Sequence, residues 1–172
     1  MRGESAPRAG VGAWRALAVG LVLIAACGRE PAETVTWPTL APIDLPPLPD
    51  LDFDQVRQGA ELYAAFCAEC HRADLSGDPQ WKTRAEDGGF RPPPHDASGH
   101  TWHHPDEELV EIVLHGYGFP VPESRMPQFF GTLTEDEVRS ILGFIKASWG
   151  TEERMYQWEQ TVRRERAVAS SG

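Results

Sequence analysis

The chain has 172 residues, of which 26 are acidic and 16 are Lys or Arg, and its formal net charge at pH 7 is −10. Such a charge disfavours binding to the polyanionic backbone of a nucleic acid and favours a basic protein partner. Removal of residues 1–26 would take away three arginines and one glutamate and leave a net charge of −12. The remainder suffices for one small domain with a limited core of its own.

The first 26 residues are interpreted as a signal peptide and not as part of the fold. Arg2, Arg8 and Arg15 make the start of the chain basic, and an apolar run of eleven residues, 16–26, follows. This run is too short to cross a bilayer as a stable helix and has the length of a signal-peptide core. We therefore expect the mature protein to lie outside the cytoplasm.

The end of this segment, Ile24-Ala25-Ala26-Cys27-Gly28, resembles a bacterial lipoprotein signal. The resemblance implies cleavage before Cys27, lipidation of Cys27 and anchoring to a membrane on the extracytoplasmic or periplasmic side. Gly28 stands where an aspartate would favour inner-membrane retention in some bacteria, so the choice of membrane stays open. The alternative is an ordinary secretory signal with an incidental cysteine.

Residues 27–50 are predicted to form a tether that begins at the lipidated cysteine. Six prolines fall between Gly28 and Asp50, and the segment has no helical or strand periodicity. Proline fixes its own φ and favours extended geometry in the preceding residue, so we expect a semi-rigid spacer. Its second half, with Leu45 and Leu48, could instead pack on the domain as a strap.

The most informative stretch is Cys67-Ala68-Glu69-Cys70-His71. Two cysteines three positions apart, followed by histidine, are typical of c-type haem attachment. Each thiol can capture one vinyl group of a haem as a thioether, and the His71 imidazole then lies beneath the iron. With Cys27 assigned to lipid, no cysteine is left over for a disulfide. The alternatives are a chance pair, a redox dithiol or half of a zinc site.

A first helix is predicted to begin at an Asp54 cap and to run through about Cys67. Its apolar side chains include Val56 and Tyr63. Gly59 is costly inside a helix, and the close approach of another helix, with Tyr63 packed on that partner, would give a physical reason for it. The alternative is a glycine that is merely tolerated.

Further helices are predicted after this motif. Proline and acidic residues start one helix near residue 105, and Gly116 stops it. A capping box at Thr134 and an apolar stripe predict another over residues 134–149. The tail could form a last helix from 151 to about 164, followed by frayed residues.

The segments between the helices carry further candidate groups. We expect a polar loop over residues 72–89 to cover a haem edge. A carbonyl of the Pro92-Pro93-Pro94 run could accept a hydrogen bond from the non-ligating nitrogen of His71. Met126, followed by a stiffening proline, is the candidate for the sixth iron ligand.

Three histidines, His100, His103 and His104, suggest either of two roles. They could bind zinc or copper with Asp96 or Asp106, or they could line a haem crevice or bond its propionates. The two remaining histidines, His95 and His115, are expected to be surface or capping residues.

Residues 54–150 resemble a class I, monohaem c-type cytochrome. The resemblance rests on the Gly59 and Tyr63 helix, the Cys67–His71 motif, the Met126-Pro127 loop and the terminal helix. It implies an all-α, small cytochrome c-like domain (residues 51–150) around one haem c, bound covalently through Cys67 and Cys70. It also implies that His71 and Met126 are the axial ligands and that the first and last helices cross near Gly59.

The resemblance implies outer-sphere electron transfer between redox protein partners by a membrane-anchored carrier and not by an enzyme. A fixed subunit of a larger oxidoreductase is compatible with the same features. Two rival functions stay open. An unligated Met126 would leave an iron site for a haem enzyme or gas sensor, and the histidine run could make the chain a copper- or zinc-handling module.

Overall fold

The computed structural model describes residues 43–116 and 124–172. The chain divides into two units, residues 1–41 and 42–172, and the second contains all of the described residues. The predictions for the signal peptide, the lipidated cysteine and the first half of the tether therefore lie outside the described residues.

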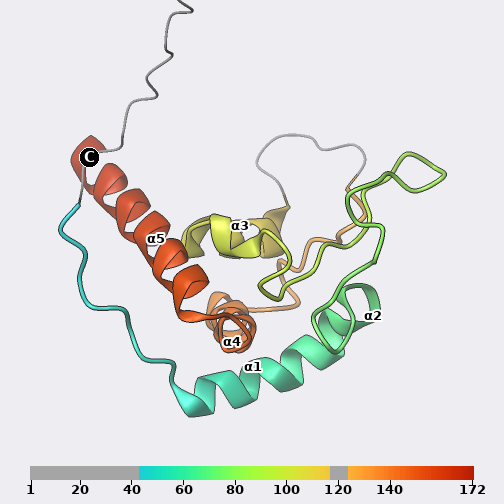
Figure 1. Cartoon of the computed structure of the whole chain (residues 1–172), viewed down its shortest axis with the longest axis horizontal. Coiled ribbons are helices and arrows are strands. Elements are labelled where there is room, and N and C mark those ends of the chain that lie inside the picture. Colours follow the sequence, from blue (N-terminus) through green and yellow to red (C-terminus); the bar gives the residue numbers. More distant parts are fainter. Residues whose placement is uncertain (1–42, 117–123) are drawn as a thin grey trace, which may run out of the picture. The chain divides into compact units, whose positions relative to one another are not determined.

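The described part of the chain is helical and contains two isolated β-bridges but no β-strand. This confirms the predicted all-α fold. In chain order the elements are α1 (Phe53–Phe66), α2 (Ala68–His71), the 3-10 helix η1 (Thr101–His103), α3 (Asp106–His115), α4 (Glu135–Lys146) and α5 (Thr151–Ser171). Helix α4 packs against both α1 and α3 (Figure 1), and α5 contacts η1 and α3.

Helix α1 begins two residues earlier than the sequence predicts. Asp52 is its N-cap, and the Asp52 carboxylate accepts a hydrogen bond of 2.8 Å from the backbone N–H of Gln55. The predicted cap, Asp54, lies in the first turn, where its side chain pairs with Arg57 at 3.2 Å. Both aspartates suit the positive end of the helix dipole, but only Asp52 has the extended backbone that a cap requires.

The crossing of α1 and α4 depends on Gly59, as predicted. A Cβ atom at Gly59 would lie 1.9 Å from the backbone oxygen of Ser140, so no larger residue fits at this position. One turn later Tyr63 is 1% exposed, and its ring lies 5.3 Å from that of Phe144 on α4. The two helices therefore meet backbone to backbone, with an aromatic pair beside the contact.

Helix α4 provides most of the core. The predicted capping box is present, with the Thr134 hydroxyl accepting from the Glu137 N–H and the Glu137 carboxylate accepting from the Thr134 N–H. Its buried apolar side chains are Val138, Ile141, Leu142 and Ile145. The helix ends at Lys146 and not at Trp149 as predicted, because the chain turns there and the Trp149 indole N–H donates to the backbone oxygen of His95.

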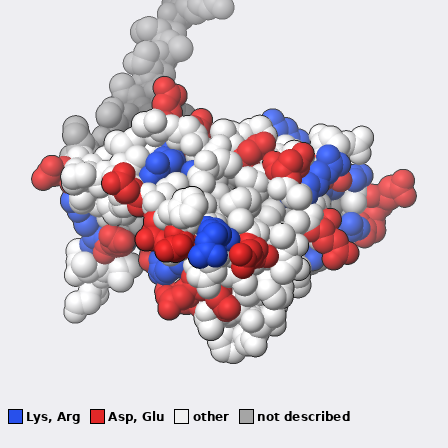
Figure 2. Space-filling model, turned by 90° about the horizontal axis from the view of Figure 1, so that it is seen from below, with Lys and Arg blue, Asp and Glu red and all other residues white. Residues whose placement is uncertain are grey.

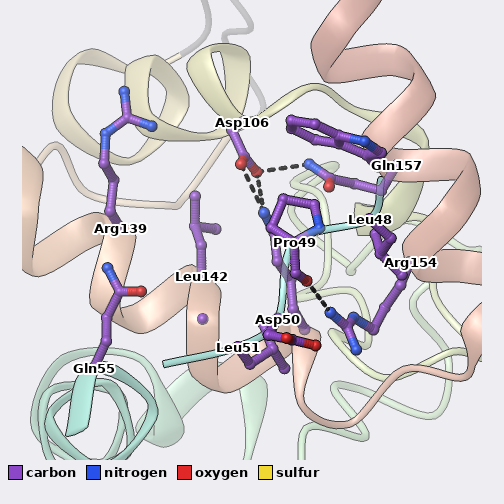
Figure 3. A pocket seen from close by; sticks show the side chains of 13 residues that line it. Leu48, Pro49, Asp50, Leu51, Gln55, Asp106, Arg139, Leu142, Arg154 and Gln157 are labelled. Carbon is purple, nitrogen blue, oxygen red and sulfur yellow. Dashed lines mark hydrogen bonds and ion pairs between the residues drawn. The ribbon is translucent and has the colours of Figure 1, made fainter. Parts of the chain in front are cut away.

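Asp106 at the start of α3 joins three helices. It accepts hydrogen bonds of 2.6 Å from Lys146 of α4 and of 2.6 Å from Gln157 of α5 (Figure 3). Gln157 is 2% exposed, and its burial fixes α5 on the domain. Within the described residues, none of the helices combines the length and the apolar character needed to cross a bilayer.

Helix α5 is longer than the sequence predicts, because it continues to Ser171 where frayed residues were expected after about residue 164. Along it lies a strap, residues 44–49, in which three backbone oxygens accept hydrogen bonds from three α5 side chains. Arg166 donates to Asp44, Trp158 to Pro46 and Arg154 to Pro49, at 2.6, 2.9 and 2.7 Å. Beneath the strap a cavity of about 200 Å³ opens between α1, α4 and α5 (Figure 3).

The Gly59 contact generates a stability prediction. Gly59→Ala should lower the free energy of unfolding by about 1–3 kcal/mol or more, because the added methyl group forces the two helix backbones apart. Denaturant unfolding followed by circular dichroism measures the change.

Gly143→Ala is the matched control, since Gly143 lies on α4 close to the same crossing. Its Cβ would meet nothing nearer than the Gln55 side chain at 3.6 Å, which is ordinary contact. Stability should therefore stay unchanged or rise by up to about 1 kcal/mol through helix propensity. Equal losses in the two variants would contradict the backbone contact as the cause.

Candidate haem site

The three residues of the Cys-X-X-Cys-His motif lie on a single helical turn. Cys67 closes α1, and Cys70 and His71 belong to the four-residue helix α2. The N–H groups of Cys70 and His71 donate to the Cys67 backbone oxygen at 3.2 and 2.9 Å, so both residues lie about one helical turn after Cys67. Cys70 is exposed, Cys67 is partly buried and His71 is only 7% exposed.

The environment of the Cys67 thiol disfavours the redox dithiol alternative. Burial and, to a smaller extent, the neighbouring Cys70 raise the pKa of Cys67 to about 11. The thiol is therefore protonated at neutral pH. A reactive dithiol requires the opposite, a thiolate stabilised by a lowered pKa.

His71 is held as a neutral ligand with one nitrogen available. Its Nδ1 lies 2.9 Å from the backbone oxygen of Pro93, which identifies the carbonyl that the proline run was predicted to supply. A carbonyl can only accept, so Nδ1 carries the proton and Nε2 keeps its lone pair. Burial lowers the pKa of His71, and this also favours the neutral imidazole.

The Pro93 carbonyl is fixed by close backbone packing on both sides. A Cβ atom at Gly77, whose φ is +61°, would lie 2.5 Å from the Pro93 carbonyl carbon. A Cβ atom at Gly99 would lie 2.0 Å from the Pro94 oxygen, and the Asp78 N–H donates to Pro92 at 2.8 Å. The loop after the motif therefore determines where the hydrogen-bond acceptor of His71 stands.

His95 was expected to be a surface or capping residue, and the structure shows that this expectation is wrong. The His95 ring stacks on the His71 ring with centroids 3.9 Å apart and planes 18° apart. Burial lowers the pKa of His95 well below its usual range, and the adjacent His71 adds to the effect. The signal missed in the sequence is the position of His95, two residues after the proline that bonds His71.

Met126 lies in a segment without regular secondary structure, after the undescribed residues 117–123, and is partly buried. Its neighbour Arg125 forms an ion pair with Asp87 of the polar loop. Three residues later, Phe129 packs edge-on against Phe66 at the end of α1, with ring centroids 6.1 Å apart. The segment that carries Met126 is thus attached both to the polar loop and to the end of the helix that precedes the motif.

The rings of His100 and His104 meet edge-on at 5.6 Å, but each of the three clustered histidines also has a neighbour of its own. His100 stacks on Trp81 at 5.4 Å, His103 packs on Trp102 at 3.8 Å, and His104 Nδ1 lies 3.1 Å from a Glu108 carboxylate oxygen. Among residues 43–116 and 124–172, no group of three or more His, Cys, Asp or Glu side chains is arranged to hold a metal ion.

The two acidic candidates and the sixth histidine also have other neighbours. The Asp96 carboxylate accepts from the hydroxyl and backbone N–H of Ser98, and Asp106 is engaged by Lys146 and Gln157. His115 is exposed in the last turn of α3, as expected, and packs on Phe130.

Several features of this region suit a porphyrin. The His71 Nε2 lone pair is a good axial donor for haem iron. Phe66, which is 38% exposed and directly precedes Cys67, offers apolar surface next to the motif. Two buried nitrogens, Arg91 Nε and His100 Nδ1, have no hydrogen-bond partner among the described residues, and both suit a carboxylate such as a haem propionate.

Comparison with known proteins gives one match. The family model described as cytochrome c oxidase, cbb3-type, subunit III matches residues 54–145, which is more than half of the chain. The matched range contains the Cys67–His71 motif and Met126 and stops one residue before the end of α4, so the strap and α5 lie outside it. No curated protein and no solved structure matches the chain.

The packing of Gly77 on Pro93 predicts that Gly77→Ala displaces the hydrogen-bond acceptor of His71. We expect a lower free energy of unfolding and a smaller low-spin fraction in the visible spectrum of the haem-loaded protein. Gly88→Ala is the matched control, because Gly88 also has a positive φ, +84°, but nothing lies within 4 Å of its added Cβ. Similar spectra from the two variants would contradict a specific role for the Pro93 contact.

Proposed function

The chain belongs to the family of subunit III of cbb3-type cytochrome c oxidase, and we propose that it is a lipid-anchored, extracytoplasmic monohaem cytochrome with His/Met-ligated iron. Membership supports a haem-binding electron-transfer protein with a haem c cofactor. The observation that supports His71 as an iron ligand in this chain is its environment: the ring is buried and neutral, and its Nδ1 is hydrogen-bonded to the Pro93 backbone oxygen.

Covalent attachment uses the two thiols of the motif. Each thiol would hold the haem through one thioether, in which a carbon–sulfur and a carbon–hydrogen bond stand in place of a vinyl double bond. The partly buried Cys67 and the exposed Cys70 stand one turn apart, which suits two vinyl groups of one macrocycle. Two thioethers then fix the haem next to the His71 ring.

Bound haem supplies one electron at a time as its iron changes oxidation state. His71 binds through Nε2, while the Pro93 carbonyl holds its proton at Nδ1 and raises its strength as a ligand. The Met126 thioether would be the second protein ligand of the iron and would favour its reduced state and raise the potential. With both ligands in place, the haem would supply electron transfer without ligand exchange.

The partners of this protein are redox proteins, and the family description points to one possible setting, an oxidase in which the chain is an electron-transfer subunit. On the face shown in Figure 2, acidic side chains lie among basic and uncharged ones. With a net charge of −10, the chain suits a basic partner surface and not a nucleic acid. The lipid on Cys27 would keep donor, carrier and acceptor at one membrane.

Visible spectra of the full chain, produced with haem-maturation machinery, test the ligand assignment. The wild-type protein should give a sharp low-spin spectrum with the weak far-red sulfur-to-iron band. Met126→Ala should abolish that band and lower the reduction potential, because a thioether is lost from the iron. Met155→Ala is the matched control, since Met155 lies on α5 and is 39% exposed.

Each contrary spectrum would indicate a different site. If the low-spin spectrum is the same in the wild type and in Met126→Ala, the sixth iron ligand would be a histidine such as His100. High-spin haem in the wild type would revive the open-site enzyme or sensor. A protein without covalent haem would contradict the proposal, and the motif would have to be reinterpreted.

Membrane anchoring makes a separate prediction. Cys27→Ser should release the protein from the membrane fraction and abolish incorporation of labelled fatty acid, while the haem spectrum stays unchanged. Gly28→Ala keeps the cysteine and serves as the control that should remain anchored. Equal membrane association of both variants would contradict lipidation at Cys27.

A further inference from the structure

We propose that His95 is a positioning residue that fixes the plane of the axial ligand His71 by stacking on its face. The inference rests on the proposed ligation of haem iron by His71 and goes beyond it. The two rings lie 3.9 Å apart and are nearly parallel, with 18° between their planes. This contact holds the face of the imidazole, whereas the Pro93 bond holds only its edge.

The two contacts restrict different motions of the ligand. A single hydrogen bond from Nδ1 to the Pro93 oxygen still allows the His71 ring to turn about the N–H···O direction. A parallel ring at 3.9 Å blocks that turn, because any rotation drives the edge of one imidazole into the face of the other. Together they define a single ring plane.

His95 can serve as a fixed wall because its own position is determined from three sides. Its backbone N–H donates to the Leu75 oxygen at 2.8 Å, and its backbone oxygen accepts from the Trp149 indole at 2.8 Å. The Tyr63 ring meets the His95 ring edge-on, with centroids 5.8 Å apart. Leu75, Trp149 and Tyr63 are all buried.

Packing alone does not account for a histidine at this position. His95 Nδ1 is buried and has no hydrogen-bond partner among the described residues, which is unfavourable for a polar atom. A leucine would fill similar space without leaving a nitrogen unpaired. What leucine lacks is a flat aromatic face, and that face is the part of His95 that meets His71.

The plane of an axial imidazole matters because its π orbital points only perpendicular to the ring. The ring plane therefore selects the iron orbital with which the ligand interacts, and this choice sets the spread of g values in the ferric electron paramagnetic resonance spectrum. A histidine free to turn would give a broadened or altered spread. This readout follows ligand orientation and does not follow stability.

The experiment compares His95→Leu, which removes the flat face, with His95→Phe, which keeps it, in the haem-loaded full chain. We expect His95→Leu to broaden or change the g values and to shift the reduction potential, and His95→Phe to restore the wild-type g values. Unfolding midpoints are measured in parallel. His115→Leu is the control, because His115 is an exposed histidine in the last turn of α3, outside this stack, and its change should alter neither spectrum nor potential.

The outcomes separate this inference from the function on which it rests. A wild-type protein without low-spin haem overturns the proposed function and, with it, the inference. A low-spin wild type whose g values are unchanged in His95→Leu, or changed equally in His95→Phe, overturns the inference alone. If His95→Leu does not retain haem, His95→Met replaces it, since methionine also fills the space without a ring plane.

Discussion

The backbone contact between Gly59 and Ser140 is the constraint on which the rest of the domain depends. Because the backbones of α1 and α4 touch there, Tyr63 reaches the core one turn later, and the motif follows directly at the end of α1. Helix α4 in turn leads to Trp149, whose indole holds the backbone of His95. One contact therefore fixes both the start of the site and the segment that supports it.

The site itself is assembled mainly from backbone atoms of a loop without regular structure. The Pro93 carbonyl holds His71, and the packing of Gly77 and Gly99 holds the proline run. Main-chain groups tie His95 to Leu75 and to Trp149. A loop built in this way can hold the His95 ring against His71 of α2 with little freedom, although no helix carries His95.

The sequence predicted what depends on local chemistry and failed where distant segments meet. The capping box at Thr134, the need for glycine at position 59 and the carbonyl partner of His71 all follow from short patterns, and the structure confirms them. The burial of His95 and the length of α5 do not, because each depends on surfaces that only the folded chain supplies. The cap of α1 was also predicted wrongly, because Asp52 and Asp54 are both residues that can cap a helix.

The strap on α5 limits how far the domain can move from its proposed anchor. Without the three hydrogen bonds from α5, the tether would run from Cys27 to the start of α1 at Phe53. With them, the free part of the tether ends at Asp44, 17 residues after Cys27. At roughly 3.3–3.6 Å per residue, the shorter tether reaches at most about 60 Å. A lipid at Cys27, as proposed, would thus keep the cytochrome within that distance of the membrane. Its encounters with a membrane-bound partner would then depend on the effective concentration near the membrane and not on the bulk concentration of the protein.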